Sequence, residues 1–170
     1  MRLFLTIRVL HILLAATWFG AAVAMLLFVV PAVQEAKGAG GAVMAGVQRR
    51  KYHVFMQAIA GLTVLTGFYL YYRFTNHFDP EMSASMGGRV FGTGGIAGIL
   101  ALVIGASVVG RTMTKIGETM AKAAALPDGP EKAALLASVG PMQARAGTFG
   151  KLVLVLMVIA IVAMSIGHYV

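Results

Sequence analysis

The sequence contains no cysteine and few acidic residues, and each shortage excludes a class of chemistry. Without cysteine there can be no disulfide, no iron–sulfur cluster on thiolates and no thioether-attached haem. The six carboxylates all fall outside the long apolar segments, so none is placed to relay protons or cations through a membrane, which argues against a pump. Phosphate-binding loops, HExxH and GxSxG motifs are also missing, and we assign no catalytic residue.

Charged residues of either sign are scarce, at 12% of the 170 residues, whereas 59% are hydrophobic. An average soluble domain has about 25% charged and roughly 45–50% apolar residues, so this composition indicates a membrane protein. The formal net charge of +8 could suggest nucleic acid in a soluble protein. In so apolar a chain it indicates orientation in the bilayer, and we expect no nucleic-acid partner.

Four apolar segments are long enough to cross a bilayer as helices, at about residues 9–30, 54–72, 90–109 and 152–167. Each is close to the ~20 residues that a spanning helix needs, and a helix satisfies its own backbone hydrogen bonds in lipid. We therefore predict an all-α integral membrane protein, a four-transmembrane-helix antiparallel bundle forming one domain over residues 1–170. We expect the first segment to be retained rather than cleaved, because Arg8 and His11 interrupt it and the run continues to Pro31.

The distribution of basic residues predicts the orientation. Ten of the fourteen Lys and Arg residues lie between the first and second segments and between the third and fourth. The positive-inside rule puts these two connections in the cytoplasm, and both termini and the 73–89 loop outside. The expected location is the bacterial inner (cytoplasmic) membrane.

The connection at about 112–150 is long enough to contain helices of its own. Apolar residues repeat at helical spacing on both sides of a Pro/Gly-rich break at 126–130, namely Met113, Ile116, Met120 and Ala124, then Leu135, Val139, Met142 and Ala146. We expect either a cytoplasmic helical hairpin extending helices three and four, or a helix lying on the lipid headgroups.

Histidines are the most informative polar residues. His11 and His168 are predicted at similar depths near the outer face, where two imidazoles could hold the iron of a b-type haem. Trp18 shares a helix face with His11. The alternative is that His11 only hydrogen-bonds a neighbouring helix and that His168 is a solvated terminus.

Small and basic residues could complete such a site. Gly94 and Gly98 belong to a small-residue stripe in the third segment, where either a flat cofactor or another helix could come close, and we expect a larger side chain at Gly98 to disrupt packing. Arg8, Arg73 and Arg89 fall at the outer rim. They could pair with haem propionates or a quinone headgroup, or simply anchor the helix ends.

A second metal-site candidate lies in the outer loop. His77, Met82 and Met86 combine imidazole with thioethers, a ligand set that suits Cu(I). Chance proximity in a chain with eleven methionines is the alternative.

The first half of the chain resembles a known family. Val9-Leu10-His11-Ile12, followed by Trp18-Phe19-Gly20 and a run ending at Pro31, resembles the opening helix of CopD-like (copper resistance protein D-like) membrane proteins. The same opening is similar to HemJ-type protoporphyrinogen oxidase, a resemblance that implies a haem-ligand role for His11. The lysine that the HemJ type requires in a later span has no counterpart in the three later segments here.

Three functions follow from these observations. We expect a membrane-embedded b-type haem protein in electron transfer, alone or as a subunit of a larger redox complex, with a quinone or redox-protein partner. A CopD-like copper-handling protein and a cofactor-free accessory subunit are the alternatives. In each case the chain is expected to work as a homo- or hetero-oligomer.

Overall fold

The computed structural model describes residues 2–36 and 40–170, which form helices joined by short turns, with no strand among them. The first long helical stretch consists of α1 (Arg2–Val23), the π-helical segment η1 (Ala24–Val29) and α2 (Val30–Glu35). After it come α3 (Gly40–Arg49), α4 (Tyr52–Phe74) and the short α5 (Pro80–Ala84). The chain continues as α6 (Met86–Ile104), the π-helical segment η3 (Gly105–Gly110), α7 (Arg111–Ala125) and α8 (Pro130–Ile166).

Four stretches are long and apolar enough to cross a membrane: Arg2–Glu35, Tyr52–Phe74, Met86–Ala125 and Pro130–Ile166. The first three contain a predicted segment, and the fourth contains all of residues 152–167 except Gly167, so the prediction of four such helices is confirmed. Three of the helical stretches extend well beyond the predicted apolar segments. At 1.5 Å per residue, the 40-residue stretch measures about 60 Å, roughly twice the thickness of a hydrocarbon core.

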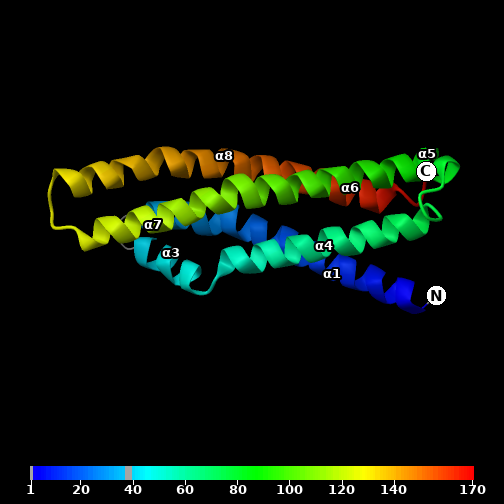
Figure 1. The fold of residues 1–170 in the computed structure, drawn as a ribbon, viewed down its shortest axis with the longest axis horizontal. Helices are drawn as coiled ribbons and strands as arrows, with labels where there is room; N and C mark the ends of the chain where they lie inside the picture. The colour runs from blue at the N-terminus through cyan, green and yellow to red at the C-terminus, as the bar shows by residue number, and fades with distance from the viewer. Residues whose placement is uncertain (1, 37–39) are drawn as a thin grey trace.

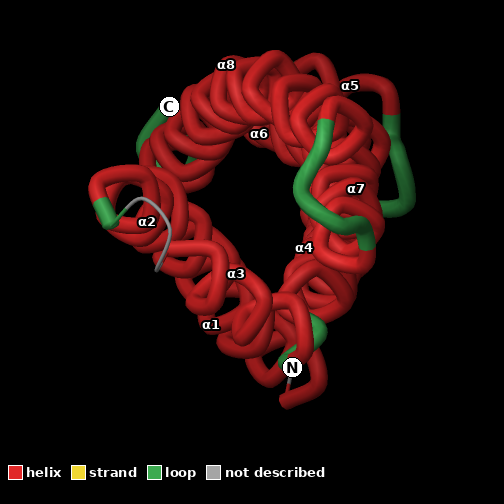
Figure 2. The backbone as a smooth tube through the Cα atoms, turned by 90° about the vertical axis from the view of Figure 1, so that its left-hand side faces the viewer, coloured by secondary structure: helices red, strands yellow, loops and turns green. Residues whose placement is uncertain are grey.

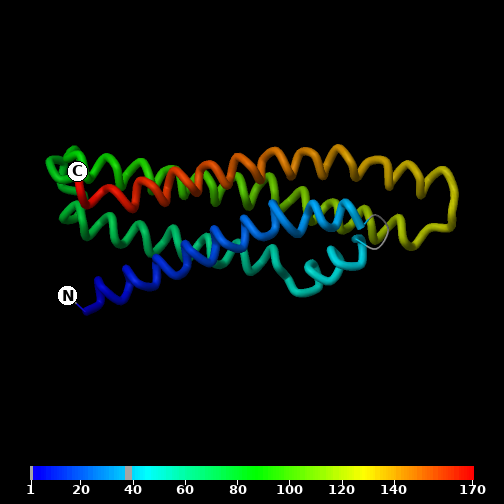
Figure 3. Tube along the Cα trace, turned by 180° about the vertical axis from the view of Figure 1, so that it is seen from behind, coloured from blue at the N-terminus to red at the C-terminus, as the bar shows by residue number. Residues whose placement is uncertain are grey.

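The long helices run side by side (Figures 1 and 3). α1 packs against α4, α4 against α6, and α6 against α8, whereas α1 and α8 share few contacts. Figure 2 looks along the long axis and shows the helices arranged around it. Both termini and α5 lie at one end, the terminal end, while α3 and the turn between α7 and α8 lie at the other, the hairpin end.

Local sequence explains where several helices begin and end. The Asp79 side chain accepts a hydrogen bond from the Met82 backbone N–H at 2.9 Å, and the Ser85 hydroxyl accepts one from Gly88 N–H at 3.1 Å. These residues are the N-caps of α5 and α6. Pro130 opens α8 at a position where no backbone N–H is needed, so the predicted break between the last two helices is confirmed.

Within residues 112–150, α7 and the first part of α8 form a helical hairpin. α7 packs along α8, and their turn projects beyond α2 and α3 (Figures 1 and 3). Of the apolar residues that repeat at helical spacing, Ile116, Val139 and Ala146 are buried, whereas Met120 and Ala124 are exposed. Thr119 and Ala123 occupy the interface in their place.

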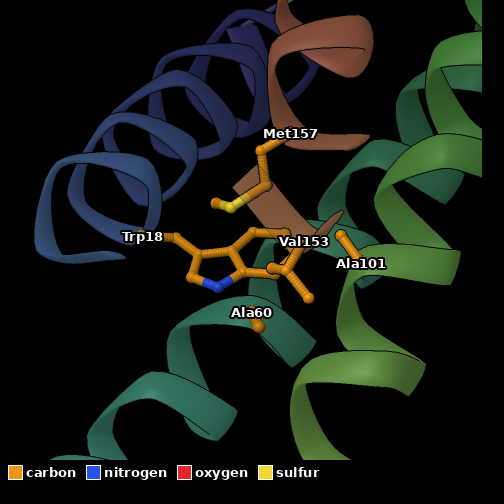
Figure 4. Packing of buried hydrophobic residues seen from close by; sticks show 5 residues of the cluster. All are labelled: Trp18, Ala60, Ala101, Val153 and Met157. Atoms are coloured by element: carbon orange, nitrogen blue, oxygen red, sulfur yellow. The ribbon is translucent and has the colours of Figure 1, made fainter. Parts of the chain in front are cut away.

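One buried cluster joins all four long stretches. It consists of Trp18 from α1, Ala60 from α4, Ala101 from α6, and Val153 and Met157 from α8 (Figure 4). The indole of Trp18 is only 7% exposed because the two alanines opposite leave room for it. Trp18 therefore anchors α1 to the other helices at mid-length.

Candidate functional site: an uncharged cavity at the hairpin end

A cavity of about 280 Å³ lies between the helices on the hairpin side of the Trp18 cluster. Trp18, Ala60, Ala101 and Val153 line it as well as forming the cluster, so the cluster closes its inner end. α3 and both segments of π-helix also contribute to its walls. Small-molecule sites have volumes of roughly 300–1,000 Å³ and lie between helices in many all-α proteins, so this cavity is close to the size of a ligand site.

Both π-helical segments face this cavity. Met25 and Leu26 of η1 line one wall, and Gly105, Ala106 and Val109 of η3 line another. A π-helical turn is rare and frequently marks a functional site. In η1 the cause is local: the ring of Pro31 would clash with the carbonyl four residues earlier, so the preceding turn opens to i→i+5 hydrogen bonding, from Val30 N–H to Met25 O.

The polar groups of the cavity are uncharged. None of the described residues that line it is Lys, Arg, Asp or Glu. Its polar side chains are Gln34, Gln48, Tyr52, His53, Gln57, Thr114 and Gln143. The Tyr52 hydroxyl donates to Ala21 O at 2.8 Å and ties α4 to α1. An apolar wall with a few neutral polar groups is the usual chemistry of a site for an uncharged amphiphile.

The four glutamines come from four different helices and were not singled out in the sequence. They lie on α2, α3, α4 and α8, and all of them line the cavity. These four are all the glutamines of the chain. Only 29 described residues line the cavity, so the glutamines are concentrated there. The scarcity of carboxamides in so apolar a chain is the signal that could have identified the site. Their convergence depends on tertiary packing, which no sequence pattern reports.

His11 lies outside this cavity, between α1 and α4. Its Nδ1 is 3.0 Å from Thr63 O and 3.0 Å from Thr66 Oγ1. The ring also lies against the backbone of Gly67, where an added Cβ would be 2.9 Å from His11 Cε1. A carbonyl only accepts, so the contact with Thr63 O is a hydrogen bond in the tautomer that has its proton on Nδ1 and its lone pair on Nε2. This tautomer matches both a structural histidine and a metal-ligating one.

The expected pairing of His11 with His168 is not formed. The His168 ring lies edge-to-face against Phe91, at 4.9 Å between centroids, and against Phe74 at 6.2 Å. His11 contacts α4 at Thr66, eight residues before Phe74, which is roughly 12 Å along the helix. His168 follows the end of α8 and is exposed, so its ring packs at the terminal end rather than reaching the level of His11.

The glycine stripe is a helix contact at one position and open at the other. A Cβ on Gly94 would meet Ala163 Cβ at 3.0 Å and Ala160 O at 3.3 Å, so α8 occupies the groove expected for a flat cofactor. A Cβ on Gly98 would meet nothing within 4 Å. The expectation that Gly98 is a close-packing position is therefore wrong, because the buried face of α6 next to it carries Ala97 and Ala101 and not Gly98.

The remaining predicted residues lie at the terminal end and form no shared site. Arg8, Arg73 and Arg89 are exposed, and within the described ranges the only ion pair joins Lys132 to Asp128. The His77 ring lies 4.6 Å from that of Tyr72. Met82 and Met86, the other two members of the copper candidate, are exposed. Among residues 2–36 and 40–170 no group of three or more His, Cys, Asp or Glu side chains could hold a metal ion.

Comparison with known proteins gives no assignment: no protein-family model, no curated protein and no solved structure matches the chain.

Proposed function

We propose that the chain is a multi-pass membrane protein that binds an apolar small molecule in the cavity at its hairpin end. In this proposal the four long helices form an antiparallel transmembrane bundle in the bacterial inner membrane. The hairpin end, with the basic connections, lies in the cytoplasm and both termini lie outside. The observation that carries the proposal is the cavity itself, which has two π-helical walls and converging uncharged polar groups.

Two glycines of one helix provide a matched test. Gly105 lines the cavity and Gly98 does not, and an added Cβ would meet nothing within 4 Å at either position. Gly105→Leu should fill part of the cavity, whereas Gly98→Leu should leave it open. We expect organic extraction and mass spectrometry of purified protein to recover about tenfold less bound compound from Gly105→Leu, equivalent to about 1.4 kcal/mol, and wild-type amounts from Gly98→Leu.

Circular dichroism would show whether both variants fold. If Gly105→Leu does not fold, Gly147→Leu is the second cavity variant and Gly140→Leu its control, because both positions have open space and only Gly147 lines the cavity. Equal amounts of the same compound from folded cavity variants and controls would contradict the proposal.

A b-type haem held by His11 is the second candidate, favoured by one observation. The hydrogen bond from His11 Nδ1 to Thr63 O leaves Nε2 as the free ligand atom, as in most metal-bound histidines. The arrangement fits one axial histidine and not the His11–His168 pair. When bound, haem would supply one-electron redox chemistry, and the Thr63–Thr66 contacts would orient the imidazole.

An absorption spectrum tests this second candidate. Purified wild-type protein should show a Soret band, His11→Ala should lose it and His53→Ala should keep it. A colourless wild type, or a band that survives in His11→Ala, would exclude His11 as a haem ligand.

A further inference from the structure

We propose that the ligand of the hairpin-end cavity is a quinone, held by its ring oxygens at the glutamine-lined end. This inference rests on the proposed function, because it names the chemical class that the same cavity binds. Its starting point is the convergence of all four glutamines, from four helices, on one cavity.

The charge of the lining excludes the commonest membrane ligands. Phospholipids carry a phosphate, and buried phosphates are bound by Arg, Lys or other strong donors, since an unpaired buried charge is costly. No described residue of the lining is Lys, Arg, Asp or Glu. The headgroup that the cavity accepts is therefore neutral.

The donors and acceptors of the lining then select among neutral ligands. A carboxamide has two N–H donors and a carbonyl acceptor. The donors match the carbonyl oxygens of a quinone, and the acceptor matches the hydroxyls of the corresponding quinol, so glutamine can bind both redox states. His53 and Gln57 are four residues apart on α4 and share one face, which places a second donor–acceptor group beside the carboxamide.

Gln57 lies close to a wall of the cavity that another helical stretch contributes. Its Nε2 lies 3.3 Å from the position that a Cβ on Gly110 would occupy, so the side chain crosses from α4 to the end of η3. Gln48, by comparison, already donates to Met113 O at 3.3 Å. The Gln57 carboxamide is exposed within the lining and has no partner among the described hydrogen bonds of the chain, so it is available to a ligand.

The remaining walls suit a flat ring with an apolar tail. Most other described side chains of the lining are apolar, among them Met25, Leu102 and Met113, and they match the ring and tail of a quinone.

Trp18 provides the test, because it is the single tryptophan of the chain and lines the cavity. Full-length protein in detergent would be titrated with decyl-ubiquinone while indole fluorescence is recorded. We expect saturable quenching in the wild type and in Gly98→Leu. Gln57→Leu, which keeps the volume of the side chain but removes its hydrogen bonds, should weaken binding by about tenfold.

Competing ligands separate the two levels of the proposal. Decyl-ubiquinol should compete with the quinone, whereas decylbenzene, decanol and phosphatidylglycerol should compete at least tenfold less well. Equal competition by decylbenzene or decanol, or unchanged affinity in Gln57→Leu, would overturn the quinone assignment. If the quinone assignment failed in this way but Gly105→Leu lost binding of the same ligands, the cavity would remain a ligand site. If every ligand quenched the indole fluorescence of Gly105→Leu as strongly as that of the wild type, the site itself would be overturned.

Discussion

Gly94 and Gly98 lie one helical turn apart on α6, yet their surroundings differ. α8 comes so close to Gly94 that an added Cβ would be 3.0 Å from Ala163 Cβ and 3.2 Å from Met164 Cε, whereas Gly98 faces open space. A repeat of small residues shows which helix face can be approached but not at which residue the neighbour approaches. The exact contact depends on the crossing of two helices, which is set by side chains on both.

This difference predicts opposite outcomes for one substitution. Gly94→Leu should force α6 and α8 apart and lower the stability by about 1–3 kcal/mol or more, as overpacking does elsewhere. Gly98→Leu should cost little. Unfolding of both variants in a denaturing detergent, followed by circular dichroism, measures the difference, and equal stability would show that the close contact at Gly94 is not formed.

At the scale of elements, hydropathy and length were enough to predict four long apolar helices and the Pro/Gly break at residues 126–130. The contact register of the hairpin was not predictable to one residue. In α7 the buried face uses Thr119 and Ala123, because small residues allow close approach to α8 and the longer Met120 remains exposed. Spacing alone cannot decide between neighbouring residues of similar helical phase.

The π-helical segments were missed for a different reason. Pro31 gave a local cause for η1, but η3 has only glycines at its two ends, Gly105 and Gly110, as a sequence signal. Both segments could be linked to function only after the fold had placed them around one cavity. The same holds for the glutamines, which are more than one hundred residues apart at the extremes, Gln34 and Gln143.

At the scale of the whole molecule, the distribution of basic residues predicts which end faces the cytoplasm. The natural absence of cysteine makes this testable with single introduced thiols. The two variants are Glu81→Cys and Ala125→Cys. Glu81 is exposed in α5 at the terminal end, and Ala125 is exposed beside the α7–α8 turn at the hairpin end.

A membrane-impermeant maleimide should label Glu81→Cys in intact bacterial cells, after outer-membrane permeabilisation where the host has one. Ala125→Cys should react only when the inner membrane is opened. The cysteine-free parent is the control for background labelling. The reverse pattern would place the cavity at the outer side and contradict the proposed topology.

Native mass spectrometry of the wild-type protein tests most directly whether the cavity is a ligand site. Released from its micelle under gentle activation, the 17.8 kDa chain should carry a neutral organic adduct of one defined mass, and Gly105→Leu should not. A wild-type spectrum that shows only the bare chain, or the same heterogeneous lipid adducts in both proteins, would contradict the proposed ligand site.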